Sequence, residues 1–143
     1  MKKIILLFVT ALILSGCNTG DGTVSSDNIT PEETYSFTGS NENWEVLFEV
    51  DVVNKDQGEN QVDENGTLTF IGEDEAPKMV DYKLKTGSGV NSNEGTGVPI
   101  YDEVGSFAQG SCGNCVPMEA DEELELEIIW DGNTEKIILN SNE

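Results

Sequence analysis

Residues 44–52, WEVLFEVDV, alternate apolar side chains with mostly acidic ones at a period of two. Successive side chains of an extended chain point to opposite faces, so this period predicts a strand with one face in a core. The face predicted to be buried carries Trp44, Val46, Phe48, Val50 and Val52. The opposite face carries Glu45, Glu49 and Asp51, together with Leu47. This stretch therefore predicts a β core.

Three further segments repeat the alternation. Their predicted inward residues are Leu68 and Phe70, then Val80, Tyr82 and Leu84, and finally Leu124, Leu126, Ile128 and Trp130. Asp131-Gly132 separates two apolar runs and predicts a tight hairpin, because glycine readily takes a positive φ. Trp44 and Trp130 both lie on predicted inward faces, which indicates core packing rather than a platform for stacking carbohydrate.

No segment keeps a 3.6-residue period, so no helix is predicted. The strand before the hairpin is expected to begin at about Glu122, and short strands are added near residues 35–37 and 106–109. The total is about seven strands separated by turn residues. This spacing is typical of two packed sheets, and we expect an immunoglobulin-like β-sandwich over residues 35–143.

The charge composition excludes several classes of function. The 143 residues include 28 Asp and Glu and seven Lys, with neither Arg nor His. Catalysis by Ser-His-Asp or Cys-His needs an imidazole, as do most zinc and non-haem iron sites. A net charge of −21 repels phosphate backbones, which disfavours nucleic acid as a partner. We therefore expect no enzyme, with no catalytic residues, no cofactor and no metal site.

The first 16 residues have the anatomy of a secretory signal: two lysines, then an apolar run over residues 4–14 that is too short to span a bilayer. The run ends in LSGC, residues 14–17, which resembles the lipobox of bacterial lipoproteins. The resemblance implies cleavage before Cys17 and a diacylglyceryl thioether on its sulfur. The alternative is an ordinary secretory signal with a coincidental cysteine. A doubly or triply acylated Cys17 would hold the chain on the extracytoplasmic face of the cell membrane.

Residues 17–34, CNTGDGTVSSDNITPEET, contain almost no apolar side chains and cannot form a core. They predict a flexible tether between the lipid and the domain at residues 35–143. Removal of residues 1–16 would leave five lysines against 28 acids, a net charge of −23.

Two stretches of the domain carry a resemblance. YSFTGSNENWEV, residues 35–46, and IIWDGNTEKIIL, residues 128–139, resemble segments of small lipoproteins of Bacillus-like Gram-positive bacteria. In those proteins an Asn-Trp pair similarly precedes a strand, and a Trp-turn-Glu hairpin ends the domain. The resemblance implies a lipid-anchored β domain and no particular activity.

Three acidic or glycine-rich stretches are candidate binding loops. Residues 51–66 are rich in oxygen ligands, but their glycines do not fit the spacing of an EF-hand calcium loop. A long hairpin loop kept soluble by its charge is the favoured interpretation, as is a solvated loop for residues 72–77. Residues 85–99 have many glycines without a phosphate-binding Lys-Ser/Thr ending, and they predict a mobile loop that could form a binding rim.

Cys112 and Cys115 are spaced C-x-x-C, which leaves three interpretations. A redox pair would need a strand-helix context that lowers a thiol pKa, and a zinc site would need two further ligands. A structural disulfide is favoured, because Gly113-Asn114 suits a tight turn and disulfides persist outside the cytoplasm. Such a turn brings its first and fourth Cα atoms within about 7 Å, close to disulfide range.

Together these features predict a lipid-anchored extracytoplasmic β protein of the cell envelope. The leading hypothesis is a non-enzymatic binding or spacer module whose partner is an envelope protein or a small molecule. One alternative is a thiol-disulfide or metal-handling lipoprotein that uses Cys112 and Cys115. A further alternative is an extracytoplasmic calcium binder.

The lipid attachment can be tested directly at Cys17. Metabolic labelling with an alkyne fatty acid is expected to mark the wild-type chain and not the Cys17→Ala variant, because the thioether needs that sulfur. The variant should still yield a folded domain, since residues 17–34 contribute nothing to the predicted core. Equal labelling of both chains would contradict the assignment.

Overall fold

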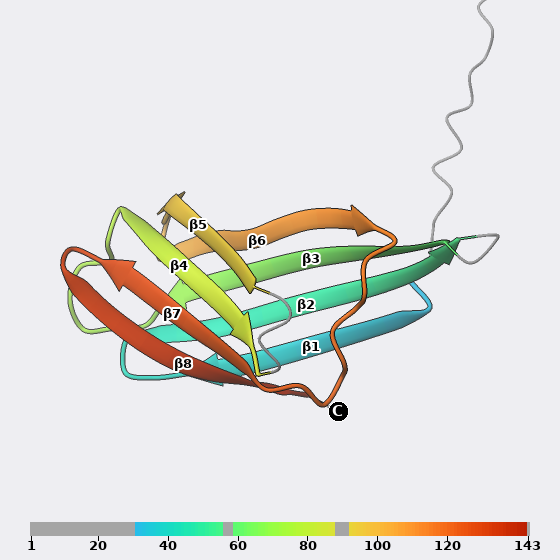
Figure 1. The fold of residues 1–143 in the computed structure, drawn as a ribbon. Coiled ribbons are helices and arrows are strands. Elements are labelled where there is room, and N and C mark those ends of the chain that lie inside the picture. The colour runs from blue at the N-terminus through green and yellow to red at the C-terminus, as the bar shows by residue number, and fades with distance from the viewer. Residues whose placement is uncertain (1–30, 56–58, 88–91, 143) are drawn as a thin grey trace, which may run out of the picture.

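The computed structural model describes residues 31–55, 59–87 and 92–142. All the regular elements in these ranges are β-strands. No helix long and apolar enough to cross a membrane occurs among the described residues. The strands are β1 (Glu33–Ser40), β2 (Trp44–Lys55), β3 (Glu59–Phe70), β4 (Met79–Thr86), β5 (Ser92–Pro99), β6 (Val104–Gly113), β7 (Leu124–Trp130) and β8 (Asn133–Ser141). The prediction of an all-β fold is confirmed (Figure 1).

The eight strands form one antiparallel sheet in the order β5-β4-β7-β8-β1-β2-β3-β6. β8 joins the two halves, because it pairs with β7 over most of its length and with β1 near its end. The sheet curls until its edge strands, β5 and β6, contact each other. The described residues of β5 and β6 form no ladder, so the sheet is nearly closed. The immunoglobulin-like sandwich is not confirmed, because β8 runs continuously from one half to the other.

Asn41 shapes the turn between β1 and β2. Its side-chain oxygen accepts hydrogen bonds from the main-chain N–H groups of Asn43 and Trp44, at 3.0 and 2.9 Å. Its amide nitrogen donates to the Glu135 carboxylate on β8 at 2.7 Å, and the Asn43 amide donates to the same carboxylate at 2.6 Å. The start of β2 is therefore tied to β8 across the core.

The hairpin between β7 and β8 is confirmed as predicted. Asp131 and Gly132 have φ angles of 46° and 82°. Two successive positive φ angles are typical of a type I′ turn, whose twist matches that of the strands it joins. Pairing starts at once, with Trp130 opposite Asn133.

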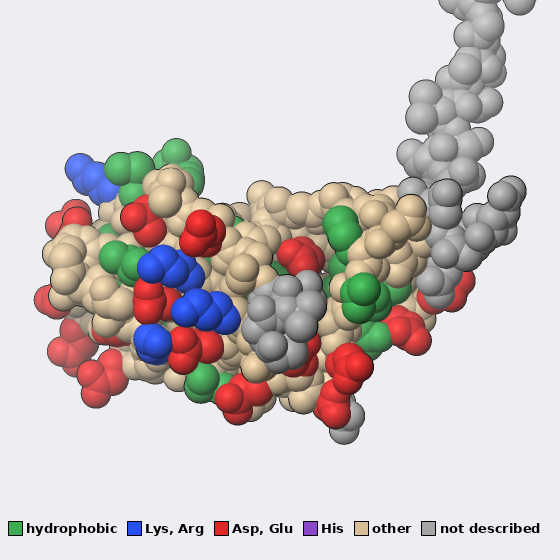
Figure 2. All heavy atoms as spheres, in the orientation of Figure 1, with side chains coloured by type: hydrophobic (Ala, Val, Ile, Leu, Met, Phe, Trp, Pro, Cys, Tyr) green, Lys and Arg blue, Asp and Glu red, His purple; other side chains and the backbone are tan. Residues whose placement is uncertain are grey.

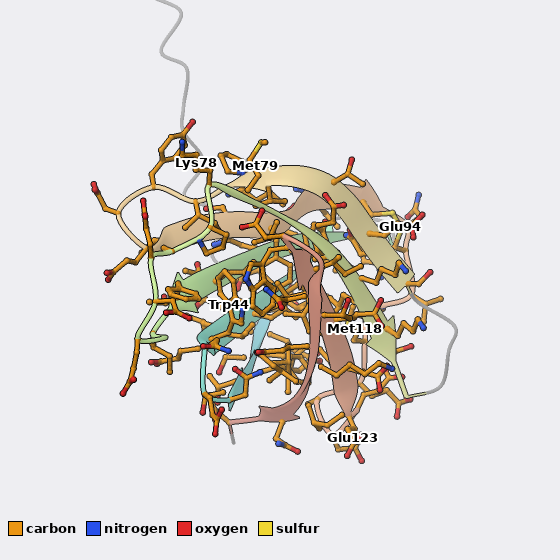
Figure 3. All side chains as sticks on the ribbon, turned by 90° about the vertical axis from the view of Figure 1, so that its left-hand side faces the viewer. Trp44, Lys78, Met79, Glu94, Met118 and Glu123 are labelled. Carbon is orange, nitrogen blue, oxygen red and sulfur yellow. A yellow bond between two sulfur atoms is a disulfide. The ribbon has the colours of Figure 1, made fainter. Side chains whose placement is uncertain are left out.

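The predicted inward faces form the core. Trp44 is fully buried, and its ring meets those of Phe70 and Trp130 edge-on, at centroid distances of 5.1 and 5.4 Å. Trp130 is itself partly buried against this core. The other predicted inward residues are buried: Val46, Phe48, Val50, Val52, Leu68, Val80, Tyr82, Leu84, Leu124, Leu126 and Ile128. In Figure 3, which looks along the strands, Trp44 lies inside the curl of the sheet.

The prediction of a mobile loop over residues 85–99 is wrong for its second half, which forms β5. This strand pairs with β4 through the main chain. Its inward positions include Asn93 and Gly95, and a Cβ atom on Gly95 would lie 2.4 Å from the Tyr82 ring. The ring occupies the place that a side chain would take, so β5 has no apolar alternation for sequence analysis to detect.

The prediction of a long hairpin loop over residues 51–66 is also wrong. β2 and β3 continue into this stretch as a paired ribbon, with Lys55 opposite Glu59. The buried pair of Val52 and Val62 keeps the ribbon on the core. Most of its acidic residues therefore lie on strands.

Truncation of Trp44 tests the alternation in β2. The ring is fully buried, so Trp44→Ala is expected to lower the free energy of unfolding by about 3 to 5 kcal/mol. Leu47 is 37% exposed on the opposite face of the strand, and Leu47→Ala should cost no more than about 1 kcal/mol. Denaturant unfolding of both variants is followed by far-UV circular dichroism, because tryptophan fluorescence would change with the loss of Trp44. Equal losses would contradict the assignment of the two faces.

Candidate functional site

A cavity of about 410 Å³ lies where β5 and β6 separate. The two strands approach each other near the turn that joins them and diverge away from it (Figure 1). The cavity is lined by Val62, Glu64, Leu84, Ser92, Asn93, Gly110, Ser111, Cys112, Cys115, Val116 and Met118. Figure 2 views this face, where acidic and apolar side chains lie beside each other to the right of centre.

The register of β3 and β6 places one acid on the inward face. Val62 pairs with Cys112, and Glu64 pairs with Gly110. Directly opposed residues of an antiparallel pair point to the same face, and Val62 is buried in the core. Glu64, two residues along the strand, therefore points to the inside as well, where it is half-buried.

The opposite wall comes from β4 and β5. Leu84 pairs with Asn93, and buried Leu84 shows that this pair faces inward. The Asn93 amide reaches across the cavity, and its Nδ2 donates to the Glu64 Oε2 at 3.3 Å. The two walls are thus bridged by one polar contact.

This contact ends a chain of hydrogen bonds. The main-chain N–H of Ala108 donates to the Tyr82 hydroxyl at 3.1 Å, and that hydroxyl donates to the Asn93 Oδ1 at 2.8 Å. The Asn93 amide then donates to Glu64. Every donor points toward the carboxylate, and hydrogen bonds aligned in this way polarise one another.

A β-bulge turns Ala108 toward this chain. The register of β3 and β6 shifts between Glu64 and Gly66, and Ala108 takes a φ of 48°. A bulge bends its strand and re-aims the groups beside it. Next to the bulge, Phe107 packs against Gly66 so closely that a Cβ on that glycine would lie 2.3 Å from the ring.

Of the lysines whose side chains the structure describes, none forms an ion pair with Glu64. Burial raises the pKa of the Glu64 carboxyl above its ordinary value, because lost hydration disfavours the charged form, and the Asn93 hydrogen bond opposes this shift. Among the side chains that the structure describes, the ion pairs join Lys83 and Lys136 to Glu125 and Glu127. These pairs lie on the outward face of β4, β7 and β8, where Figure 2 shows lysines among acids.

The third wall is the segment after β6. A disulfide joins Cys112 to Cys115, with Cα atoms 5.8 Å apart, as favoured from the sequence. Asn114 has a φ of 58° in the intervening turn. Its N–H donates to the Asn60 carbonyl at 2.8 Å, and the Asn60 amide donates to the Cys115 carbonyl at 2.9 Å. The chain then places Met118 in the core, inside the sheet in Figure 3.

The acidic stretches considered as cation-binding loops do not form such a site in the described part of the chain. No group of three or more His, Cys, Asp or Glu side chains in the described ranges is arranged to hold a metal ion. Residues 73–75 are three exposed acids in a row. Cys17 lies outside the described residues. The structure thus assembles the Cys112–Cys115 pair and adds Glu64, which sequence analysis missed. Counting back from Leu68 in steps of two reaches Gly66, Glu64 and Val62, and this signal could have found it.

Comparisons with known proteins bear on the N-terminal segment. Residues 1–18 match the family model described as a prokaryotic membrane lipoprotein lipid attachment site. The match spans the predicted signal and Cys17, and it supports covalent anchoring of the chain to a membrane. No curated protein and no solved structure matches the chain. The resemblance to small lipoproteins of Bacillus-like bacteria therefore has no match to support it.

The burial of Glu64 predicts a dependence of stability on pH. Because its pKa is raised in the folded protein, the folded state binds more protons than the unfolded state between the ordinary and the raised pKa. The free energy of unfolding therefore falls as the pH rises through that window. Glu64→Gln removes the charge and keeps an acceptor for Asn93. We expect a higher melting temperature for this variant at pH 7, and a gain that shrinks as the pH falls to the ordinary value of 4.5.

Melting curves of both chains over this pH range measure the effect. Glu94→Gln is the matched control, because Glu94 is exposed on β5 next to Asn93 and projects outward in Figure 3. This control should leave the melting temperature nearly unchanged at every pH. A lower melting temperature for Glu64→Gln at pH 7 would show that the carboxylate has a stabilising partner.

Proposed function

We propose that this chain is a lipid-anchored extracytoplasmic binding protein, without enzymatic activity, that holds a small molecule in the cavity between β3, β5 and β6. The observation that carries the proposal is Glu64, an acid on the inward face of a strand at the wall of a 410 Å³ cavity. Cavities of about 300 to 1,000 Å³ with a few convergent polar groups are typical of small-molecule sites.

The position of Glu64 supports binding rather than a purely structural role. A spacer domain gains nothing from a carboxylate that faces the core, because burial of a charge lowers stability unless it is paired. Val62 and Leu68 on the same face of β3 are buried apolar residues, so an apolar residue at position 64 would fit the pattern. Groups with perturbed pKa values in a cavity are concentrated at functional sites.

The cavity holds few groups that could perform chemistry. Its lining includes one carboxylate, Glu64, and two cysteines joined as a disulfide. The described lining residues contain no second acid at the spacing of about 5 to 10 Å that paired-carboxylate hydrolysis requires. Binding without turnover is the activity that this lining supports best.

The chain enters the sheet at the end that holds the cavity. Glu33, at the start of β1, pairs with Val52, which pairs with Val62, which in turn pairs with Cys112. With strands about 4.8 Å apart, this row places Glu33 within about 15 Å of the cavity wall. The flexible tether expected from the sequence at residues 17–34 would have a mean reach of about 20 to 25 Å. A lipid on Cys17 would therefore hold the cavity near the extracytoplasmic surface of the cell membrane.

Gly110 offers a direct test of the cavity. It faces Glu64 across the β3–β6 pair, and a Cβ atom there meets nothing within 4 Å. Gly110→Phe should place a ring in the cavity. Fragments from a water-soluble library that bind the wild type in ligand-observed NMR should then no longer bind. Gly113 also has open space, but it pairs with Gln61 on the opposite face.

Gly113→Phe is therefore the matched control and should bind the same fragments as the wild type. Far-UV circular dichroism checks that both variants are folded. Fragment binding that survives in folded Gly110→Phe, or a library with no binder at all, would contradict the proposed function.

A further inference from the structure

The polar groups of the cavity are arranged to receive a positive charge. Glu64 is the acceptor at the end of the donor chain that starts at the Ala108 N–H and passes through Tyr82 and Asn93. Because the Tyr82 hydroxyl donates to the Asn93 oxygen, the Asn93 Nδ2 is oriented toward the carboxylate. All of this polarity favours negative charge on Glu64, and a ligand that meets it must bring a donor or a cation.

The rest of the lining is suited to a carbon skeleton. Val62, Leu84 and Met118 are buried apolar residues of the core that also line the cavity. They come from β3, from β4 and from the segment after the disulfide, and the exposed side chain of Val116 adds to the apolar lining. A ligand that fits has a compact apolar body and one charged end.

Three other classes of ligand fit less well. An anion would meet Glu64 and a chain with a net charge of −21, which repel it. A neutral apolar molecule would remove the remaining water from a carboxylate without pairing it, which is costly. Calcium takes six to eight oxygen ligands, and Glu64 is the one carboxylate in the described lining.

We infer that the cavity binds a small organic amine, with its ammonium group paired to the Glu64 carboxylate and its carbon skeleton against Val62, Leu84 and Met118. This inference rests on the proposed binding function and names the class of ligand. An alkyl amine with a pKa near that of lysine, about 10.4, is protonated at neutral pH. The strongly negative chain raises the local concentration of such cations.

Two methionines provide a built-in readout of binding. Cleavage before Cys17 removes Met1, and the remaining methionines are Met79 and Met118. Met118 lines the cavity, whereas Met79 is 60% exposed at the start of β4. Carbon-13 labelling of the methionine methyl groups gives one resonance inside the site and one outside, and Met79→Leu assigns them. The lipidated protein is kept in nanodiscs of zwitterionic phosphatidylcholine.

The probes are cyclohexylamine, cyclohexanol and cyclohexanecarboxylate, which share a ring and differ in charge. At neutral pH cyclohexylamine should shift the Met118 methyl resonance and leave that of Met79 in place. Loss of a charge-assisted hydrogen bond in Glu64→Gln should weaken this binding about tenfold or more. Cyclohexanol should bind the wild type more weakly than the amine, and equally in both chains, and the carboxylate should bind least.

Equal affinity of the amine for wild type and Glu64→Gln would overturn the inference, as would an alcohol that binds the wild type as tightly as the amine. Either result leaves the binding function in place, because a ligand still occupies the cavity. Failure of all three probes to shift Met118 would also overturn it, and the comparison of Gly110→Phe with Gly113→Phe then decides separately whether the cavity binds any molecule.

Discussion

Tyr82 links β5 and β6, the two edge strands of the nearly closed sheet, whose described residues form no main-chain ladder with each other. Its ring lies against Gly95 on β5 and packs edge-on against Phe107 on β6, at a centroid distance of 5.1 Å. Its hydroxyl bonds to Ala108 on β6 and Asn93 on β5. The same side chain therefore joins the two edge strands beside the cavity, through Asn93, which lines it.

Much of the fold could be predicted because burial on one face of a strand leaves a period of two in the sequence. That period is clear around Trp44 and Ile128, where apolar side chains make the contacts. It is absent from β5, where Gly95 yields its space to a ring from β4. Around Glu64 the period continues, but the acid suggests a solvated loop. The fold could thus be predicted where apolar side chains on the same face of the sheet pack against one another. The site could not be predicted where a residue is determined by a side chain from another strand, as Gly95 is by Tyr82.

The disulfide is one of several contacts that hold the outer wall of the cavity. Closing a loop as short as Cys112–Cys115 stabilises the folded state by about 2 kcal/mol in the chain-entropy model. Burial of Met118 contributes about 1.5 to 3 kcal/mol, and Asn60 adds two hydrogen bonds to the same segment. Since these contributions are of similar size, the wall does not depend on the disulfide alone. This balance agrees with a structural clip rather than a bond that must open for function.

In the proposed function, the carboxylate of Glu64 lowers the stability of the fold and favours the binding of a cation. This carboxylate is half-buried and has a raised pKa, so ionisation at neutral pH weakens the fold. The donor chain from Ala108 offsets part of this loss by stabilising the anion. Under the proposed function, a cation in the cavity would pair with this carboxylate, and the stability lost through its burial would be recovered on binding. An apolar residue at this position would stabilise the empty domain and remove that gain. The acid on the inward face is thus consistent with the proposed binding of a cation.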